Sequence, residues 1–270
     1  MAESLLIIEN LTKRFGGVVA VDRLSFEVQP GMIYSIIGPN GAGKTTIFNC
    51  ISGLYRPDAG TIRFKGQEIT HLKPHQIARL GIARTFQNIE LFSHMTTMEN
   101  LMLGRHIHMK TGIWHSLWLL WRRSPAAQEE IANRERVEKI IDFLELQSVR
   151  DRMVNSLPYG RQKLVELGRA LALEPRLLML DEPSAGMNSE ERQDLYFWLQ
   201  DIKEELGVTI LMIEHNMQMV MGISDRVLAV DFGKKIIEGT PDEVANHPDV
   251  IKAYLGEDEF ATSIAESEQR

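Results

Sequence analysis

The chain has 270 residues, of which 44% are hydrophobic and 25% charged, values typical of a globular protein rather than a disordered one. Its 30 Lys and Arg residues against 37 Asp and Glu give a formal net charge of −7, which disfavours a general nucleic-acid binder because such proteins need basic surface. A chain of this length accommodates one mixed core, with or without a smaller subdomain.

The compartment follows from three further features. Cys50 is the single cysteine, so no internal disulfide forms. The start, Met1-Ala-Glu-Ser4, lacks a secretory signal pattern, and apolar runs such as Leu117–Trp121 are far shorter than the roughly 20 residues that span a bilayer. We therefore expect a cytoplasmic protein that does not cross a membrane by itself but can lie against one.

The first part of the chain predicts strands and one helix. Short runs of apolar and β-branched residues alternate with turns rich in glycine and proline. The expected strands are Leu5–Ile8, Val18–Val28, Ile33–Ile37 and Thr61–Phe64, and a helix is expected to begin near Lys44.

The middle of the chain predicts helices, and the last third predicts alternating elements. Between about Thr97 and Leu173 apolar residues recur at helical spacing, most clearly in Gln128–Leu146 and Arg161–Leu173. Strands and helices then alternate, which predicts a parallel sheet covered by helices. These elements are Leu177–Leu180, Glu190–Leu206, Thr209–Ile213, Met217–Met221 and Val227–Val230. The chain is therefore predicted to be an α/β core with a helical insertion.

A glycine-rich loop after Ile33–Ile37 fits the phosphate-binding P-loop pattern. It runs Gly38, Pro39, Asn40, Gly41, Ala42, Gly43, Lys44, Thr45 and Thr46. Glycines let backbone N–H groups point at phosphate oxygens, and the following helix adds its positive N-terminal end. Lys44 would neutralise the β- and γ-phosphates, and the Thr45 hydroxyl would bind Mg²⁺.

A pair of acids ends the apolar run Leu177–Leu180. Open α/β sheets bind ligands at the carboxyl ends of their strands, which suits Asp181 as a magnesium ligand. Glu182 would orient or deprotonate an attacking water. Two acids at a solvated strand end would be the simpler explanation, but the P-loop earlier in the chain favours the functional one.

Over nearly its whole length the chain resembles the ATP-binding subunits of ABC transporters. Six motifs occur in that family's order and approximate spacing, namely Gly38–Thr46, Gln87 in Thr85-Phe-Gln-Asn88, Leu157–Leu171, Asp181-Glu182, Ser184–Asn188 and His215. The resemblance implies a P-loop NTPase core with a mainly parallel sheet, an N-terminal antiparallel β-subdomain and an inserted α-helical subdomain at about 90–173. The ATPase domain would cover 1–256, and 257–270 would be an acidic tail.

The resemblance also implies roles for individual residues. Gln87 would bind Mg²⁺ and sense the γ-phosphate, His215 would contact the γ-phosphate, and Phe15 would stack on adenine. Tyr159, Gly160 and Arg161 belong to the signature motif, which in this family acts on ATP held by the opposite subunit. ATP and Mg²⁺ are thus the expected cofactors, and active sites would form in a head-to-tail dimer.

The signature motif departs from the common family form at Pro158, where serine is usual. Proline removes a hydroxyl and a backbone N–H that would meet the γ-phosphate. Gly160 and the helix N-terminus remain as anion binders, and Arg161 offers a compensating charge. We expect ATP still to close the dimer, with a weaker γ-phosphate contact.

Several segments narrow the resemblance to one branch, the larger ATPase subunit of high-affinity branched-chain amino acid importers. They include Arg84–Phe92, Thr97–His106, Ile213–Met217 and Glu238–Pro241. The implied partners are a second ATP-binding subunit, the same or different, two transmembrane permease subunits and, indirectly, a periplasmic solute-binding protein. The implied location is the cytoplasmic face of the inner (plasma) membrane. Urea, amides and aromatic acids are the alternative substrates.

Two rival functions lack the sequence features that they would need. A soluble ABC ATPase acting on ribosomes or DNA usually needs a second nucleotide domain, a long coiled coil or a metal insertion, and the sequence shows none of these. A P-loop kinase or GTPase is the other rival, but the sequence contains no Asn-Lys-x-Asp guanine-reading motif.

The insert Trp114–Trp121 is followed by Arg122-Arg123. It suits either a surface that faces the membrane or the permease, or a hydrophobic patch packed on the helical subdomain.

Overall fold

The computed structural model describes residues 4–85, 89–108 and 125–254, and these fall into two compact units. The first, which we name the sheet unit, combines Met1–Gln87 with Arg176–Arg270, and the second, the helical unit, is Asn88–Pro175. The Trp114–Trp121 insert, Gln87 and the acidic tail lie outside the described residues. Among the described helices, none has both the length and the apolar character that a bilayer crossing requires.

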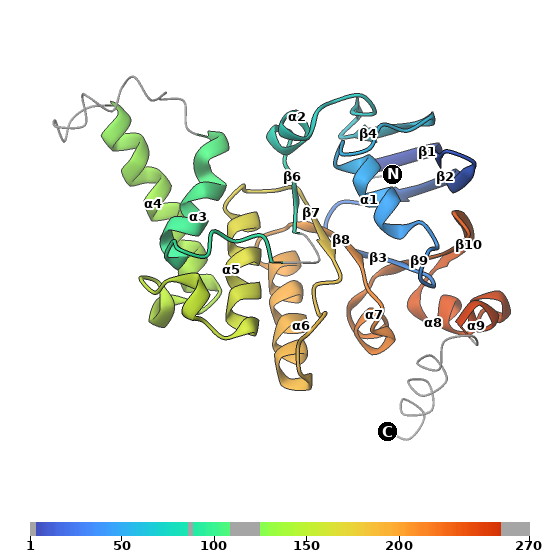
Figure 1. Cartoon of the computed structure of the whole chain (residues 1–270). Helices are drawn as coiled ribbons and strands as arrows, with labels where there is room; N and C mark the ends of the chain where they lie inside the picture. Colours follow the sequence, from blue (N-terminus) through green and yellow to red (C-terminus); the bar gives the residue numbers. More distant parts are fainter. Residues whose placement is uncertain (1–3, 86–88, 109–124, 255–270) are drawn as a thin grey trace. The chain divides into compact units, whose positions relative to one another are not determined.

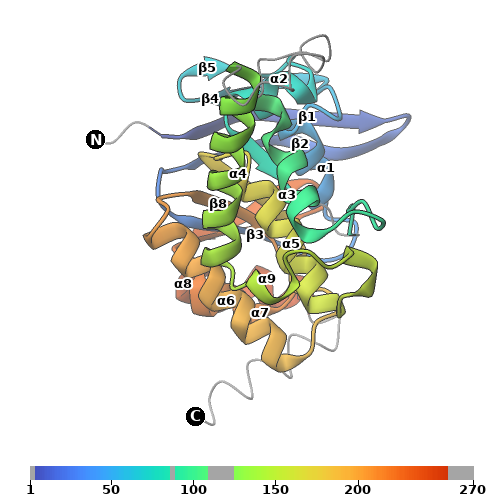
Figure 2. The same cartoon turned by 90° about the vertical axis from the view of Figure 1, so that its left-hand side faces the viewer.

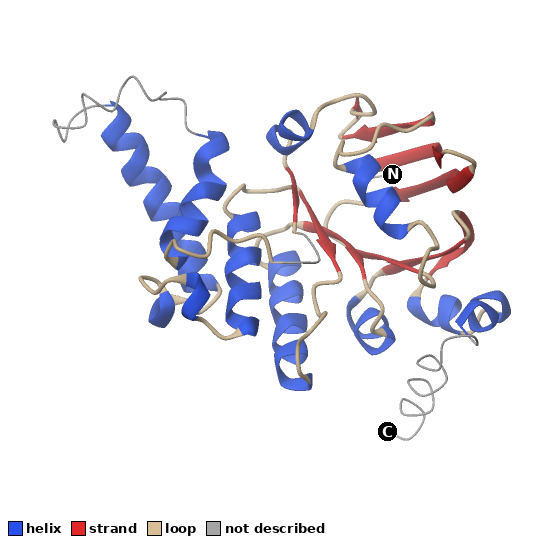
Figure 3. Ribbon diagram, viewed as in Figure 1, coloured by secondary structure: helices blue, strands red, loops and turns tan. Residues whose placement is uncertain are grey.

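The sheet unit contains two sheets (Figures 1 and 3). The smaller, antiparallel sheet has the strand order β2-β1-β4-β5, formed by β1 (Leu6–Phe15), β2 (Val18–Val28), β4 (Ala59–Phe64) and β5 (Gln67–Glu68). The larger sheet has the order β10-β9-β3-β8-β7-β6 and is parallel except for β10. Its strands are β3 (Ile33–Ile37), β6 (Ile82–Arg84), β7 (Leu177–Asp181), β8 (Thr209–Ile213), β9 (Arg226–Asp231) and β10 (Lys234–Gly239).

Helices cover the larger sheet on both faces. Helix α1 (Lys44–Ile51) lies between the two sheets, and α6 (Ser189–Glu204), α7 (Met217–Ile223) and α8 (Pro241–Ala245) lie on the opposite face (Figure 1). Two further short helices, α2 (Pro74–Arg79) and α9 (Pro248–Tyr254), complete the described part of the unit. The strands β3, β7 and β8 are buried along their whole length, as expected for a parallel sheet covered on both sides.

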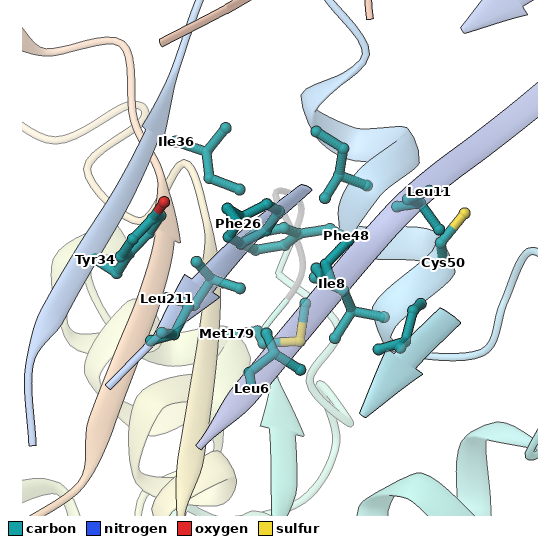
Figure 4. Close-up of a cluster of buried hydrophobic side chains, with 14 of the residues drawn as sticks. Leu6, Ile8, Leu11, Phe26, Tyr34, Ile36, Phe48, Cys50, Met179 and Leu211 are labelled. Atoms are coloured by element: carbon teal, nitrogen blue, oxygen red, sulfur yellow. The ribbon is translucent and has the colours of Figure 1, made fainter. Parts of the chain in front are cut away.

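The core between the two sheets forms around α1. Phe48 and Cys50 of α1 pack among Leu6, Ile8 and Leu11 of β1, Phe26 of β2, Tyr34 and Ile36 of β3, Met179 of β7 and Leu211 of β8 (Figure 4). All of these side chains are buried. The loop that begins α1 is therefore fixed by a core on its carboxyl side.

The helical unit consists, in its described residues, of helices, short 3-10 turns and one isolated bridge (Figures 2 and 3). Helices α3 (Thr97–Arg105), α4 (Pro125–Phe143) and α5 (Tyr159–Leu171) pack against one another. The 3-10 turns are His106–His108, Gln147–Val149 and Val154–Ser156. Arg105 of α3 is fully buried and donates hydrogen bonds to Asn133 Oδ1 and Ala172 O, which ties the three helices together.

The predicted elements match the structure where the pattern is long or strongly apolar. Val18–Val28, Ile33–Ile37 and Thr209–Ile213 have the predicted bounds. The predicted strand Leu5–Ile8 is wrong in length, because β1 continues through three irregularities in its pairing to Phe15. The elements β6, β10, α2, α8 and α9 had no prediction, since each is short and most carry polar residues.

Candidate active site

The P-loop follows β3, and its glycines occupy places that other residues do not fit. Gly38 has φ 155° and Gly43 has φ 97°. A Cβ atom on Gly38 would lie 2.1 Å from Val230 O, and one on Gly43 would lie 2.3 Å from Ala20 O. Those contacts are too short for any side chain, so both positions require glycine on steric grounds as well as for their backbone conformation.

Lys44, the first residue of α1, directs its amine into the P-loop. The side chain is 6% exposed, and Nζ donates hydrogen bonds to Gly38 O at 2.6 Å and Pro39 O at 2.9 Å. Of the two threonines that follow, Thr45 is exposed and Thr46 half-buried. The loop therefore holds a buried cation close in sequence to the exposed residues Asn40 and Gly41, and a cation in a glycine-rich loop suits phosphate recognition.

The register of the larger sheet brings the predicted acids to the same edge as this loop. Ile36 of β3 and Asp181 of β7 both pair with Ile213, the last residue of β8 that lies between them. The P-loop, the Asp181-Glu182 pair and the residues after β8 thus all follow the carboxyl ends of three adjacent parallel strands. This edge is where open α/β sheets bind their ligands.

Glu182 and His215 contact each other across this edge. Glu182 Oε1 lies 2.9 Å from His215 Nε2, and the two side chains are 21% and 28% exposed. Glu182 has φ 49°, a left-handed conformation that is uncommon for a residue other than glycine, and its N–H donates to Ile213 O at 2.9 Å. A strained backbone that aims a carboxylate at a histidine is typical of a functional site.

Asp181 has a partner that the sequence analysis missed. Arg84, the last residue of β6, donates from one guanidinium nitrogen to Asp181 Oδ2 at 2.9 Å. Its other terminal nitrogen donates to Asn49 Oδ1 at 2.7 Å and Ser52 Oγ at 3.0 Å, and the guanidinium lies 5.6 Å from the centre of the Phe48 ring. Burial raises the pKa of Asp181 above its usual range, and Arg84 opposes that shift.

Glu214 was also missed. It is 2% exposed and follows β8 directly. Its carboxylate accepts hydrogen bonds from the backbone N–H groups of Ser184 at 2.9 Å, His215 at 2.8 Å and Asn216 at 3.1 Å. The available sequence signal was an acid immediately after the buried strand Thr209–Ile213.

Phe15 is the last residue of β1, in the smaller sheet. Its side chain is 42% exposed and meets the Tyr55 ring edge-on, with 5.2 Å between ring centres. Lys13 Nζ lies 5.2 Å from the centre of the Phe15 ring. Tyr55 and Lys13 were not predicted. Phe15 therefore belongs to a small cluster with a second exposed ring and a lysine whose amine also pairs with Asp58 Oδ2 at 3.5 Å.

The signature residues belong to the helical unit. Pro158 is the N-cap of α5 and supplies no side-chain cap; Tyr159 is 42% exposed and Gly160 is buried. Arg161 donates to Glu145 O at 3.2 Å, so its guanidinium is used within the unit. The structure thus brings together Lys44, Asp181, Glu182 and His215, whereas Tyr159, Gly160 and Arg161 are described in the other unit.

Comparison with known proteins identifies the class of protein. The family model described as ABC transporter matches residues 21–185, more than half of the chain, so the chain belongs to the ABC transporter family and is an ABC-type ATPase. Residues 234–259, which include β10, α8 and α9, match a second model, Branched-chain amino acid ATP-binding cassette transporter.

Individual relatives and solved structures agree with this assignment. The chain is 43% identical to the high-affinity branched-chain amino acid transport ATP-binding protein BraF of Pseudomonas aeruginosa, over 95% of this chain and 100% of that protein. It is 42% identical to the LivG protein of the same description from Escherichia coli, with the same coverage. A crystal structure of the ADP conformation of MJ1267, an ATP-binding cassette of an ABC transporter, has a TM-score of 0.81 and 34% identity, covering 94% of this chain and all of that one.

Proposed function

We propose that this chain is the ATP-hydrolysing subunit that powers the import of branched-chain amino acids. The observation that carries the hydrolytic part is the 2.9 Å contact between Glu182 Oε1 and His215 Nε2, at the edge that also bears the P-loop. The substrate part is supported by relatives 42–43% identical over 95% of the chain that are described as branched-chain amino acid transport proteins.

The residues present fit a nucleotide and Mg²⁺. A loop with glycines in left-handed conformations and the buried Lys44 amine suits the phosphates, and Phe15 with Tyr55 suits an adenine ring. Thr45 and Asp181 offer the hard oxygen ligands that Mg²⁺ prefers, with Gln87 as the third expected ligand. When bound, Mg²⁺ would neutralise phosphate charge as it develops during transfer.

In the proposed reaction, Glu182 accepts the proton of the attacking water. Its contact with His215 fixes the orientation of the carboxylate. His215 would in turn contact the γ-phosphate of the bound nucleotide. The buried Glu214 carboxylate accepts a hydrogen bond from the His215 N–H and so fixes the backbone of the histidine. Tyr159, Gly160 and Arg161 act on nucleotide held by the opposite ATP-binding subunit, which completes each site in a dimer.

The remaining partners follow from the proposed role. Two permease subunits provide the path across the membrane, a periplasmic protein delivers the solute to them, and this chain lies on the cytoplasmic face of the inner membrane. Affinity purification from solubilised membranes tests this arrangement. Recovery of integral membrane proteins and a second ATPase is expected, whereas recovery of ribosomes would contradict it.

Uptake assays test the substrate. A strain that lacks this gene is expected to lose uptake of leucine, isoleucine and valine, and a plasmid copy of the gene restores it. A Glu182→Gln copy provides the matched control, because it leaves the protein in place and removes hydrolysis. Normal branched-chain uptake with loss of urea, amide or aromatic acid uptake would assign the same motor to another substrate.

A further inference from the structure

The ion pair between Arg84 and Asp181 is built into the sheet unit rather than lying on its surface. The two side chains are 8% and 5% exposed, and Arg84 joins β6 to β7 through this carboxylate. The same guanidinium donates to Asn49 in the helix that follows the P-loop and to Ser52, the C-cap of that helix. Arginine suits this place because its planar group bonds in several directions at once.

Arg84 therefore puts a fixed positive charge on the carboxylate that is expected to serve Mg²⁺. The guanidinium uses Oδ2 of Asp181, so a metal ion there shares the carboxylate with a second cation. Two cations on one buried carboxylate repel each other, and each weakens the binding of the other. The same charge has the opposite effect on a nucleotide without metal, because it offsets the repulsion between Asp181 and the phosphates.

We propose that Arg84 sets the magnesium requirement of nucleotide binding, by supporting metal-free nucleotide and opposing Mg²⁺ at Asp181. Arg84 acts through Asp181 and is a positioning residue rather than a catalytic one. This inference rests on the proposed nucleotide and magnesium sites, and it extends them by assigning a resident cation to the metal ligand.

Equilibrium binding of ADP, which is not hydrolysed, provides the test. Calorimetry on the full chain measures ADP affinity in excess EDTA and then across a Mg²⁺ titration, for wild type, Arg84→Gln and Arg84→Lys. In Arg84→Gln we expect about tenfold weaker ADP binding in EDTA and about a tenfold lower Mg²⁺ concentration at half-maximal effect. Arg84→Lys keeps the charge but loses the fork geometry, so smaller shifts in the same two directions are expected.

Arg63→Gln is the matched control, because Arg63 makes an exposed ion pair with Glu9 in the smaller sheet. It is expected to behave as wild type in both conditions. Equal weakening in EDTA and in Mg²⁺ by Arg84→Gln would show a merely structural role and overturn the inference, as would no change in either. If Arg84→Gln does not fold, Arg84→Lys provides the test. It should still show both weaker ADP binding in EDTA and a lower Mg²⁺ concentration at half-maximal effect. Failure of wild type to bind ADP would instead contradict the proposed function.

Discussion

The two units begin their phosphate-related helices in different ways. In the sheet unit, α1 begins at Lys44 after the N-cap Gly43, which supplies no side-chain cap. The residues around this start are held by contacts within the unit, including the two hydrogen bonds of Lys44. In the helical unit, α5 starts at Pro158 without a side-chain cap. Other helices are conventionally capped, for example α3 by Thr96 and α6 by Asn188. An uncapped helix start leaves N–H groups for an anion, but only the sheet unit surrounds its start with the groups that hydrolysis needs.

This difference suggests that the two units contribute in different ways, the sheet unit to the chemistry and the signature segment to assembly of the site. Glu182, His215 and Glu214 form a connected group within the sheet unit. The signature segment contributes a helix end and an exposed tyrosine, which suits the role proposed for it against nucleotide on another subunit. Changes in the sheet unit are therefore expected to act on chemistry, and changes in the signature segment on assembly of the site.

The largest effect is expected from Glu182→Gln. The amide keeps the shape of the side chain but does not accept the proton of the attacking water, so the ATPase rate should fall by about 100-fold or more while nucleotide affinity is retained. Phosphate release measured with equilibrium ATP binding checks this. Glu205→Gln, an exposed change at the end of α6, is the control. Persistent hydrolysis in Glu182→Gln would place the general base elsewhere.

A smaller loss is expected from Glu214→Ala. Three backbone N–H groups lose their acceptor, at a cost of roughly 1–3 kcal/mol for each group left buried and unpaired. Because those groups hold Ser184 and His215, kcat should fall about tenfold or more with ADP affinity nearly unchanged. Glu214→Gln keeps one carbonyl acceptor, so its kcat should lie between those of wild type and Glu214→Ala. Equal losses in ADP affinity and kcat would instead indicate a general defect of the sheet unit.

How far the sequence predicted these parts depends on the range of the contacts. The P-loop, Asp181 and Glu182 were found because each is signalled by a local pattern next to an apolar strand. Arg84 and Asp181 are 97 positions apart, and their pairing depends on β6 lying beside β7. Glu214 reaches Ser184 across 30 positions. Side-chain partners of this kind follow from the order of the strands in the sheet. A three-residue strand such as β6 is too short for its sequence to predict the strand or its neighbour.

Asn188 shows the opposite outcome, because the structure explains a residue that the sequence analysis named only as the end of the Ser184–Asn188 motif. In the structure its Oδ1 accepts from Glu191 N at 3.0 Å, and Glu191 Oε2 accepts from Asn188 N at 3.0 Å. Asn188 and Glu191 therefore form a capping box at the start of α6, and asparagine is among the preferred N-cap residues.

Cys50 gives the sheet unit a reporter that the helical unit lacks, because it is the only cysteine of the chain. Burial raises the pKa of its thiol from 9.0 to about 11. Between these values the folded chain keeps a proton that the unfolded chain loses, so the free energy of unfolding falls as pH rises. At pH 10 the free energy of unfolding has fallen by about 1.4 kcal/mol because of this thiol. Urea unfolding at pH 8 and pH 10 should therefore show a fall in the free energy of unfolding that is larger by about this amount in wild type than in Cys50→Ala. Equal falls in the two proteins would contradict the prediction.

The smallest effect is expected from Pro158→Ser, which gives α5 a side-chain cap of the kind that α3 and α6 have. A serine hydroxyl at the N-cap accepts from the first turn and should stabilise the helical unit by about 1 kcal/mol, seen as a higher unfolding midpoint. The restored hydroxyl and N–H should also strengthen the proposed γ-phosphate contact, raising ATP affinity or the ATPase rate about fivefold. Pro158→Ala separates the two, since it restores the N–H without the cap. Unchanged ATP affinity and ATPase rate in Pro158→Ser would show that proline does not weaken the shared site, and the difference between the two units would then be structural alone.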